Sequence, residues 1–293
     1  MAYLFGIDGG GTGCRAAVAD SSGRVLGRGK SGPANIVTDG ELALKNIIAA
    51  AHGACDAAHL SPDVLAEADG VLGLAGANIG KFGPRIAARL PFRKASVETD
   101  ALIALHGALG DADGAVAIIG TGSVFIARQG DTIRTVGGWG FMVGDLGSGA
   151  RVGRALLQEA LLAHDGVHAG SPLTDEVLAR FDGNPQSLVE YAHMARPGEF
   201  GTFASLVFDH AERGDSIGRS LVEGAVRSIE EALDAILPPG CDRLCLLGGL
   251  AGPYRKSLTA RYQALLREPI GDALDGAVAL ALQRFRQTEA AGG

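Results

Sequence analysis

The sequence predicts an α/β protein in which mixed sheets flanked by helices occur in two copies. Apolar segments of strand length alternate with amphipathic helical segments through the first 110 residues. A strand, a turn rich in Gly and Thr, and a second strand open the chain at 4–19. The same pattern returns at 115–136, which indicates an internal duplication.

The opening turn has the composition of a phosphate-binding loop. An apolar strand ends at Asp8, and the chain then passes through Gly9, Gly10, Gly11 and Thr12. Glycines let backbone N–H groups approach an anion closely, because no Cβ stands in the way. The Thr12 hydroxyl can donate to a phosphate, and Asp8 can hold a hydrated Mg²⁺. The turn therefore predicts nucleotide binding.

Three other interpretations compete for the glycines in this region. Gly11-x-Gly13-x-x-Ala16 fits a relaxed dinucleotide fingerprint, but that motif must open a helix, and here the chain turns into a third strand at 24–29. Gly29-Lys30-Ser31 resembles the end of a Walker A loop, but Arg stands where the first glycine is required. The third alternative is a hairpin turn that binds no ligand, although a tight turn does not need three consecutive glycines together with Asp and Thr.

The rest of the first half alternates helices and strands. The apolar periodicity predicts helices at 40–58, 81–90 and 101–109 and strands at 68–76 and 95–98. With the opening hairpin and its third strand, these elements predict a mixed sheet flanked by helices. We expect residues 1–110 to form an N-terminal domain.

The second half repeats the opening unit. A strand at 115–119 leads into a second turn and then into strands at 124–128 and 132–136. Two such units facing one another would place both turns on the walls of a central cleft. We expect residues 111–293 to form a C-terminal domain with a helical insertion at 150–237, and the helix at 272–286 to pack near the N-terminal domain. The residues of the second turn are Gly120, Thr121, Gly122 and Ser123.

Composition narrows the class of protein. Hydrophobic residues make up 47% of the chain and charged residues 20%, which is typical of a soluble globular protein. The net charge of −7 argues against nucleic acid and acidic membranes as partners. No leader pattern or long apolar run occurs, so we expect a cytoplasmic protein. The 4 cysteines form no CxxC pair, which disfavours disulfides and structural zinc.

The motifs together carry a resemblance to a known family. Asp-Gly-Gly-Gly-Thr, the later Gly-Thr-Gly-Ser and a late strand that ends in Gly-Gly-x-Ala resemble the actin, Hsp70 and sugar-kinase superfamily. Within it, almost the whole chain resembles the BadF/BadG/BcrA/BcrD ATPase family, and particularly its glucosamine and N-acetylglucosamine kinases. The resemblance implies duplicated ribonuclease H-like (actin-like ATPase) domains that use ATP and Mg²⁺.

The resemblance also implies roles for individual residues. It makes Asp100 the catalytic base, Asp8 a magnesium ligand through water, and the two Gly/Thr turns the phosphate loops. Where the family usually carries an acidic or polar residue after the loop aspartate, this chain has Leu146, so substrate preference stays open. The implied adenosine motif contains Gly248, Gly249 and Ala251. The implied sugar-binding residues are Asn35, Asp100, Thr121, Gly138, Trp139 and Asp145.

Purely structural roles compete with these assignments. Asp100 could cap the helix that follows it, although Thr99 could also do so. Trp139 could belong to a core, but so glycine-rich a loop suits a platform for the apolar face of a sugar. Asp145 could cap the helix that begins near Ser148.

The motifs and the resemblance together predict an ATP-dependent amino-sugar kinase that acts on the 6-hydroxyl of glucosamine or N-acetylglucosamine, and the resemblance implies a homodimer. One alternative is an activator ATPase for radical dehydratases, which needs cysteines for an iron–sulfur cluster, and no Cys occurs between Cys55 and Cys241. The other is a sugar sensor without catalysis, which would need a DNA-binding extension ahead of the first strand.

Overall fold

The computed structural model describes residues 3–290, with side chains described through residue 285. The chain forms two compact units, each described here by itself. Unit 1 runs to Ala112 and resumes at Glu268, whereas unit 2 is the continuous segment Asp113–Arg267. Among the residues described, no helix is both long and apolar enough to span a membrane.

Unit 1 is built on a mixed sheet, called sheet A, with the strand order β3-β2-β1-β4-β5. β1 pairs antiparallel with β2 and parallel with β4, and β4 pairs parallel with β5. The strands are β1 (Leu4–Gly9), β2 (Cys14–Ala19), β3 (Val25–Ser31), β4 (Asp69–Leu74) and β5 (Lys94–Thr99). The helices are α1 (Gly40–Ala57), η1 (Pro62–Glu67), α2 (Phe82–Ala87), α3 (Asp100–Leu109) and α12 (Ala273–Ala290).

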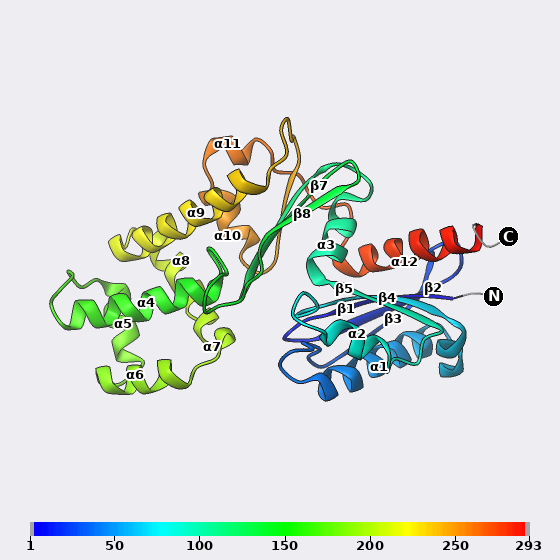
Figure 1. The fold of residues 1–293 in the computed structure, drawn as a ribbon. Coiled ribbons are helices and arrows are strands. Elements are labelled where there is room, and N and C mark those ends of the chain that lie inside the picture. The colour runs from blue at the N-terminus through cyan, green and yellow to red at the C-terminus, as the bar shows by residue number, and fades with distance from the viewer. Residues whose placement is uncertain (1–2, 291–293) are drawn as a thin grey trace. The chain divides into compact units, whose positions relative to one another are not determined.

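Helices cover both faces of sheet A (Figure 1). Because side chains alternate along a strand, Phe5 and Ile7 of β1 pack on the face that α1 covers. Leu4 lies on the opposite face, against α3 and α12. A Cβ built at Gly6 would lie 2.7 Å from Val278 Cγ2, so this glycine allows α12 to pack closely on β1. The last helix thus completes the core around the first strand.

Unit 2 contains a second mixed sheet, sheet B, with the strand order β8-β7-β6-β9. Its strands are β6 (Gly114–Ile119), β7 (Ser123–Gln129), β8 (Thr132–Gly137) and β9 (Leu244–Leu247). A helical core packs against one of its faces, with Ile119 and Phe125 fully buried. The helices are α4 (Gly149–His164), α5 (Pro172–Ala179), α6 (Pro185–Met194), α7 (Pro197–Gly201), α8 (Ala204–Glu212), α9 (Ser216–Ile236), α10 (Ala251–Ser257) and α11 (Ala260–Gln263).

The two sheets share one pairing scheme. β6 pairs antiparallel with β7 and parallel with β9, as β1 does with β2 and β4. β7 then pairs antiparallel with β8, as β2 does with β3. The predicted α/β class, with mixed sheets flanked by helices and a duplicated strand, turn and strand unit, is therefore confirmed.

Candidate functional site

The first Gly/Thr turn connects β1 to β2 at one edge of sheet A. Gly10 N–H donates to Gly13 O at 2.9 Å, which closes the turn, and Ala34 N–H donates to Gly10 O at 2.8 Å. Thr12 is exposed at its tip. The turn is thus held by its own backbone, while its hydroxyl and its central peptide units face solvent.

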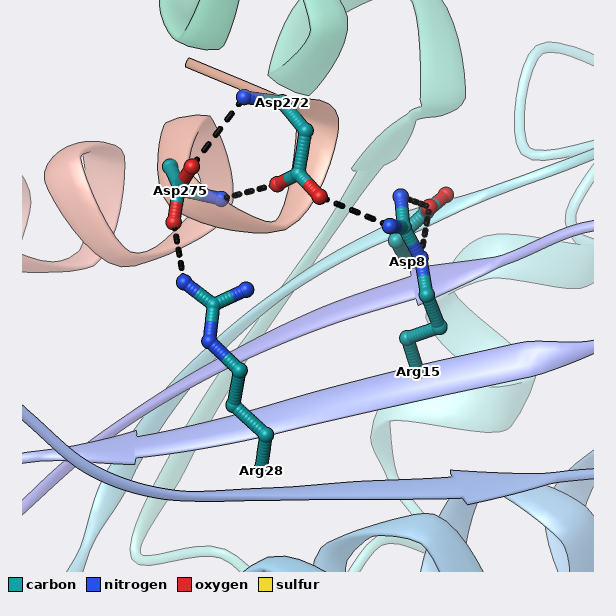
Figure 2. Close-up of polar contacts among 5 residues, drawn as sticks. All are labelled: Asp8, Arg15, Arg28, Asp272 and Asp275. Carbon is teal, nitrogen blue, oxygen red and sulfur yellow. Dashed lines mark hydrogen bonds and ion pairs between the residues drawn. The ribbon is translucent and has the colours of Figure 1, made fainter.

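Asp8 lies just before this turn and is paired with Arg15 on the neighbouring strand (Figure 2). Arg15 Nε and Nη2 donate to Asp8 Oδ2 at 3.1 and 2.6 Å. Arg15 Nη1 donates to Asp272 Oδ2 at 2.7 Å, immediately before α12. One guanidinium therefore links two carboxylates that are 264 positions apart in sequence, between residues 8 and 272.

Asp100 begins α3 at the same edge of the sheet. Gly9 is in register with Leu74, and Leu74 with Thr99, so the carboxyl ends of β1, β4 and β5 meet there. Thr99 caps α3 by accepting from Leu102 N–H at 3.2 Å, so the capping role belongs to Thr99. Asp100 Oδ1 accepts from the adjacent Ala101 N–H at 2.9 Å.

Burial is the main cause that raises the pKa of Asp100 above its ordinary value. The negative charge of Asp8 raises this pKa further, whereas the hydrogen bond from Ala101 N–H opposes the shift. A carboxylate with a raised pKa is a stronger base, because its proton is bound more tightly. Asp100 combines this property with a place beside the first Gly/Thr turn.

Asn35 lies in the loop that follows β3, near the same edge. Its Oδ1 accepts from Val37 N–H at 3.0 Å and from Thr38 N–H at 3.1 Å. The neighbouring Ile36 N–H donates to Ala75 O at 3.2 Å, just beyond β4. Within the described part of the chain, the Asn35 amide nitrogen donates no hydrogen bond, so it is available to a ligand.

The second Gly/Thr turn lies in unit 2, between β6 and β7. Gly120 N–H donates to Gly122 O at 2.9 Å and closes the turn. Gly149 N–H at the start of α4 donates to Gly120 O at 2.8 Å. Thr121 is exposed, whereas Ser123 is buried and its hydroxyl donates to Leu146 O at 2.7 Å. This turn is therefore tied to the loop before α4.

That loop, residues 138–148, carries the remaining predicted sugar-binding residues. Gly138 adopts φ +73°, in the left-handed region, and Trp139 is 73% exposed. Asp145 has φ +58° and is 7% exposed, and its carboxylate lies beside Gly122, where a Cβ would be 3.0 Å from Asp145 Oδ2. Ser148 caps α4, so Asp145 does not. The Asp145 carboxylate instead lies against the second turn.

The electrostatics of Asp145 differ from those of an exposed carboxylate. Burial is the main cause that raises its pKa, and the Ser123 and Gly140 N–H groups together with the Arg151 charge oppose the shift. Arg151 Nη1 also donates to Gly144 O at 3.1 Å, so α4 braces the same loop. The loop is thus ordered by several polar contacts while Trp139 remains exposed.

The third glycine loop follows β9 and begins α10. Gly248 has φ +92°, and a Cβ there would lie 2.4 Å from Ile119 O, so the fold itself requires this glycine. Leu250 N–H donates to Ile119 O at 3.1 Å. The fully buried Tyr254 donates from its hydroxyl to Gly147 O at 2.6 Å. Unit 2 therefore connects the third loop, at residues 248–251, to the loop that carries Trp139.

At three positions, one in each loop, the fold itself does not require a glycine. At Gly11, Gly120 and Gly249 a Cβ would meet no atom within 4 Å, and none of the three has a positive φ that would exclude a side chain. Packing and backbone conformation thus leave these positions open to other residues. Space kept free beside backbone N–H groups is what a phosphate or a nucleotide needs.

Asp8, half-buried beside the first of these loops, also suits a hydrated Mg²⁺, which prefers few protein carboxylates and several waters.

The predicted residues divide between the two units. The structure brings Asp8 and Asp100, together with Asn35 and the first turn, to one edge of sheet A. In unit 2 it brings the second turn, the Trp139 loop and the third loop together. Sequence analysis missed Arg15, Asp272 and Tyr254. A single Arg in the otherwise apolar strand β2 was the available signal for Arg15.

Comparison with known proteins agrees with this architecture. Glucosamine kinase GspK of Vibrio cholerae is 36% identical over 282 residues, which cover 96% of both chains. N-acetyl-D-glucosamine kinase of Dictyostelium discoideum is 30% identical over 149 residues, which cover 48% of this chain and 46% of that protein. The crystal structure of a Chromobacterium violaceum protein assigned as an N-acetylglucosamine kinase superposes with a TM-score of 0.88 at 32% identity, covering 96% of this chain and 99% of that one.

The family profile covers nearly the whole sequence. The profile of the BadF/BadG/BcrA/BcrD ATPase family matches residues 5–278, from the first strand into α12. This span includes both Gly/Thr turns, Asp100 and the third glycine loop. The chain therefore belongs to the BadF/BadG/BcrA/BcrD ATPase family.

Proposed function

We propose that this protein is an ATP-dependent amino-sugar kinase, which transfers the γ-phosphate of ATP to the 6-hydroxyl of glucosamine or N-acetylglucosamine. The similarity to a glucosamine kinase across 96% of both chains carries this proposal. Units 1 and 2 would be its two actin-like ATPase domains. The geometry of the predicted site residues supports this function.

Asp100 would act as the general base. It would accept the proton of the sugar 6-hydroxyl as the oxygen attacks the γ-phosphorus, and the bond from that phosphorus to the bridging oxygen of ADP would break. Its raised pKa supports this role, and so does the assignment of the helix cap to Thr99. Positioning and charge neutralisation supply most of the catalysis in such transfers.

The Gly/Thr turns and the third glycine loop would hold the nucleotide. Backbone N–H groups beside Gly11 and Gly120, with the Thr12 and Thr121 hydroxyls, would bind the phosphates. The adenosine would lie against the backbone at Gly248, Gly249 and Ala251. The open space at Gly11, Gly120 and Gly249 supports these roles.

Asp8 would hold Mg²⁺ through water. When bound, the metal supplies positive charge that offsets the charge developing on the phosphate oxygens. The half-buried carboxylate of Asp8 suits outer-sphere contact, because Mg²⁺ dehydrates reluctantly. In the structure, the positive charge of Arg15 pairs with one carboxylate oxygen of Asp8 and so offsets the negative charge of this side chain.

The predicted sugar-binding residues would contact the substrate through polar groups and one aromatic ring. The amide nitrogen of Asn35 would donate to a hydroxyl, and the exposed Trp139 ring would lie under the apolar face of the sugar. Gly138, Thr121 and Asp145 would complete the subsite. Leu146 follows Asp145 in place of a polar residue. The kinetic assay below therefore decides whether the substrate carries an amino or an acetamido substituent.

A coupled assay with ATP and Mg²⁺ on glucosamine, N-acetylglucosamine and glucose tests the proposal. We expect turnover on one amino sugar well above that on glucose, with the 6-phosphate as product by mass spectrometry and NMR. Failure on all three sugars, with slow ATP hydrolysis remaining, would contradict the kinase and favour the activator ATPase class instead.

Two further elements complete the proposal, the first implied by the family resemblance and the second expected from the sequence. We propose a homodimer, which light scattering coupled to size-exclusion chromatography would measure. We also propose a cytoplasmic location, where ATP is available, and fractionation of cells that produce the protein would test it.

A further inference from the structure

Arg15 holds the Asp8 carboxylate by one oxygen only (Figure 2). Its Nε and Nη2 both donate to Oδ2, at 3.1 and 2.6 Å. Over the residues described, Asp8 Oδ1 accepts no hydrogen bond. A guanidinium and a carboxylate ordinarily pair as two forks, with one N–H to each oxygen. The one-sided contact therefore needs a cause.

Asp272 binds the same guanidinium from the other side. Its Oδ2 accepts from Arg15 Nη1 at 2.7 Å, so the guanidinium is shared between two carboxylates. The planar guanidinium moves as a unit, and the contact on Nη1 restricts its rotation toward Asp8 Oδ1. Without Asp272, the same guanidinium would be free to engage both oxygens of Asp8.

Asp272 is itself fixed in place. Its Oδ1 accepts from Asp275 N–H at 3.0 Å, and its own N–H donates to Asp275 Oδ2 at 3.1 Å. Gly271 N–H donates to Gly107 O at 2.9 Å, and a Cβ at Gly107 would lie 1.9 Å from Asp272 O. The start of α12 is thus locked to α3, the helix that begins with Asp100.

The surroundings of Asp272 also favour its negatively charged form. Burial raises its pKa, but the Asp275 N–H and the positive charges of Arg15 and Arg28 outweigh burial and lower the pKa below its ordinary value. Asp272 is therefore ionised at neutral pH and can compete with Asp8 for the guanidinium.

We propose that Asp272 is a positioning residue for the magnesium site, because it draws Arg15 to one side and keeps Asp8 Oδ1 open to a metal-bound water. This inference rests on the proposed function, since it assumes that Asp8 receives the magnesium of a nucleotide complex. The segment before α12 would then contribute to metal binding, although its sequence contains no motif that indicates such a role.

Calorimetric titration of the full chain with ADP, with and without Mg²⁺, tests the inference in the Asp272→Asn variant. An amide oxygen can still accept from Asp275 N–H, so the start of α12 is preserved while the charge is lost. We expect ADP affinity with Mg²⁺ to fall about tenfold, the lower end of the effect of removing a supporting residue at a metal site. We expect affinity without Mg²⁺ to stay unchanged.

Two further variants separate positioning from general support. Arg28→Gln is the matched control, because it removes a neighbouring ion pair, that of Arg28 on β3 with Asp275 of α12 at 2.5 Å, and leaves the contacts of Arg15 with Asp8 and Asp272 in place. We expect no change in affinity. In an Arg15→Gln background, Asp272→Asn should have no further effect on the magnesium dependence, because the guanidinium that it restrains is gone.

The outcomes are distinguishable. An equal loss of ADP affinity with and without Mg²⁺, no loss at all, or the same loss in the Arg15→Gln background would overturn the role of Asp272 while leaving the kinase proposal intact. Failure of the unmodified protein to bind ADP with Mg²⁺ would overturn the proposed function, and this inference with it.

Discussion

At the scale of single residues, Asp100 combines two properties that suit a base. Thr99 accepts the capping hydrogen bond of α3, so Asp100 is free of that role. Burial, with the charge of Asp8 as a lesser cause, raises its pKa. The second property determines how activity should depend on pH.

We expect kcat/KM to fall as the pH drops through the raised pKa of Asp100, because the base must be ionised to accept a proton. The acid limb should therefore lie above about 3.9, the ordinary pKa of Asp. A profile of kcat/KM against pH on the preferred sugar measures this limb. An acid limb at or below the ordinary value would contradict the assignment.

The Asp100→Asn variant gives a complementary prediction. We expect turnover to fall by about a hundredfold to ten-thousandfold, the usual contribution of a general base. Affinity for ADP with Mg²⁺ should stay within about twofold by calorimetry, because the carboxylate contacts the sugar rather than the nucleotide in the proposed mechanism. Full turnover in this variant would exclude Asp100 as the base.

Alanine substitutions should have different effects at a glycine that faces open space and at a glycine that faces the core. In Gly11→Ala the new methyl group meets no protein atom within 4 Å, so we expect unchanged stability but at least about tenfold weaker ADP binding. In Gly6→Ala the methyl group would lie 2.7 Å from Val278, so we expect a loss of about 1–3 kcal/mol in unfolding free energy.

Urea denaturation and calorimetry on both glycine variants measure the two effects. Weakened nucleotide binding confined to the destabilised Gly6→Ala variant would contradict the role of Gly11 at the phosphates.

Several site residues were predictable from sequence because their signal is local. The first turn combines Asp8, glycines and Thr12 within a few positions, and the second turn repeats the pattern. The pairing of Arg15 with Asp272 was not predictable, because it joins residues 257 positions apart and depends on where α12 packs. The assigned roles of the predicted residues remain predictions.

At the scale of elements, α10 supports the Trp139 loop through Tyr254. Tyr254→Phe would leave Gly147 O buried without its donor, so we expect a loss of about 1–3 kcal/mol in unfolding free energy. Tyr191→Phe is the control, because its hydroxyl bond to Glu199 O is 3.3 Å long and exposed. Urea denaturation followed by circular dichroism compares them, and equal losses would argue against a special role for Tyr254.

Strong periodicity made most elements predictable. The helices α1 and α3 and the strands of both Gly/Thr units follow the predicted bounds within a few residues. The 3₁₀ helix η1 and the four-residue helix α11 were not predicted, because segments so short carry too little periodicity to mark a helix. Their positions depend on tertiary contacts, such as the hydrogen bond from Tyr262 to Asp234.

At the scale of the whole molecule, the predicted site residues occur in both units. Asp8 and Asp100 belong to unit 1, whereas Thr121, Trp139 and Asp145 belong to unit 2. Since the transfer requires the sugar hydroxyl and the γ-phosphate to be held next to one another, we expect each ligand to strengthen the binding of the other.

Calorimetric titration of ADP with Mg²⁺ in the presence and absence of saturating amino sugar measures this coupling, and we expect an increase in affinity of about fivefold or more. Glucose is the control ligand, with a smaller expected effect. Identical ADP affinities with and without the amino sugar would contradict the coupling.

The placement of α12 also has a consequence for how the protein is made. Unit 1 is interrupted in sequence by all of unit 2, and α12 covers Leu4, Ala17 and Val71 of sheet A. During translation this apolar face stays uncovered until the ribosome has finished the intervening unit. A nascent chain stopped before Glu268 would therefore leave that face exposed to chaperones and proteases.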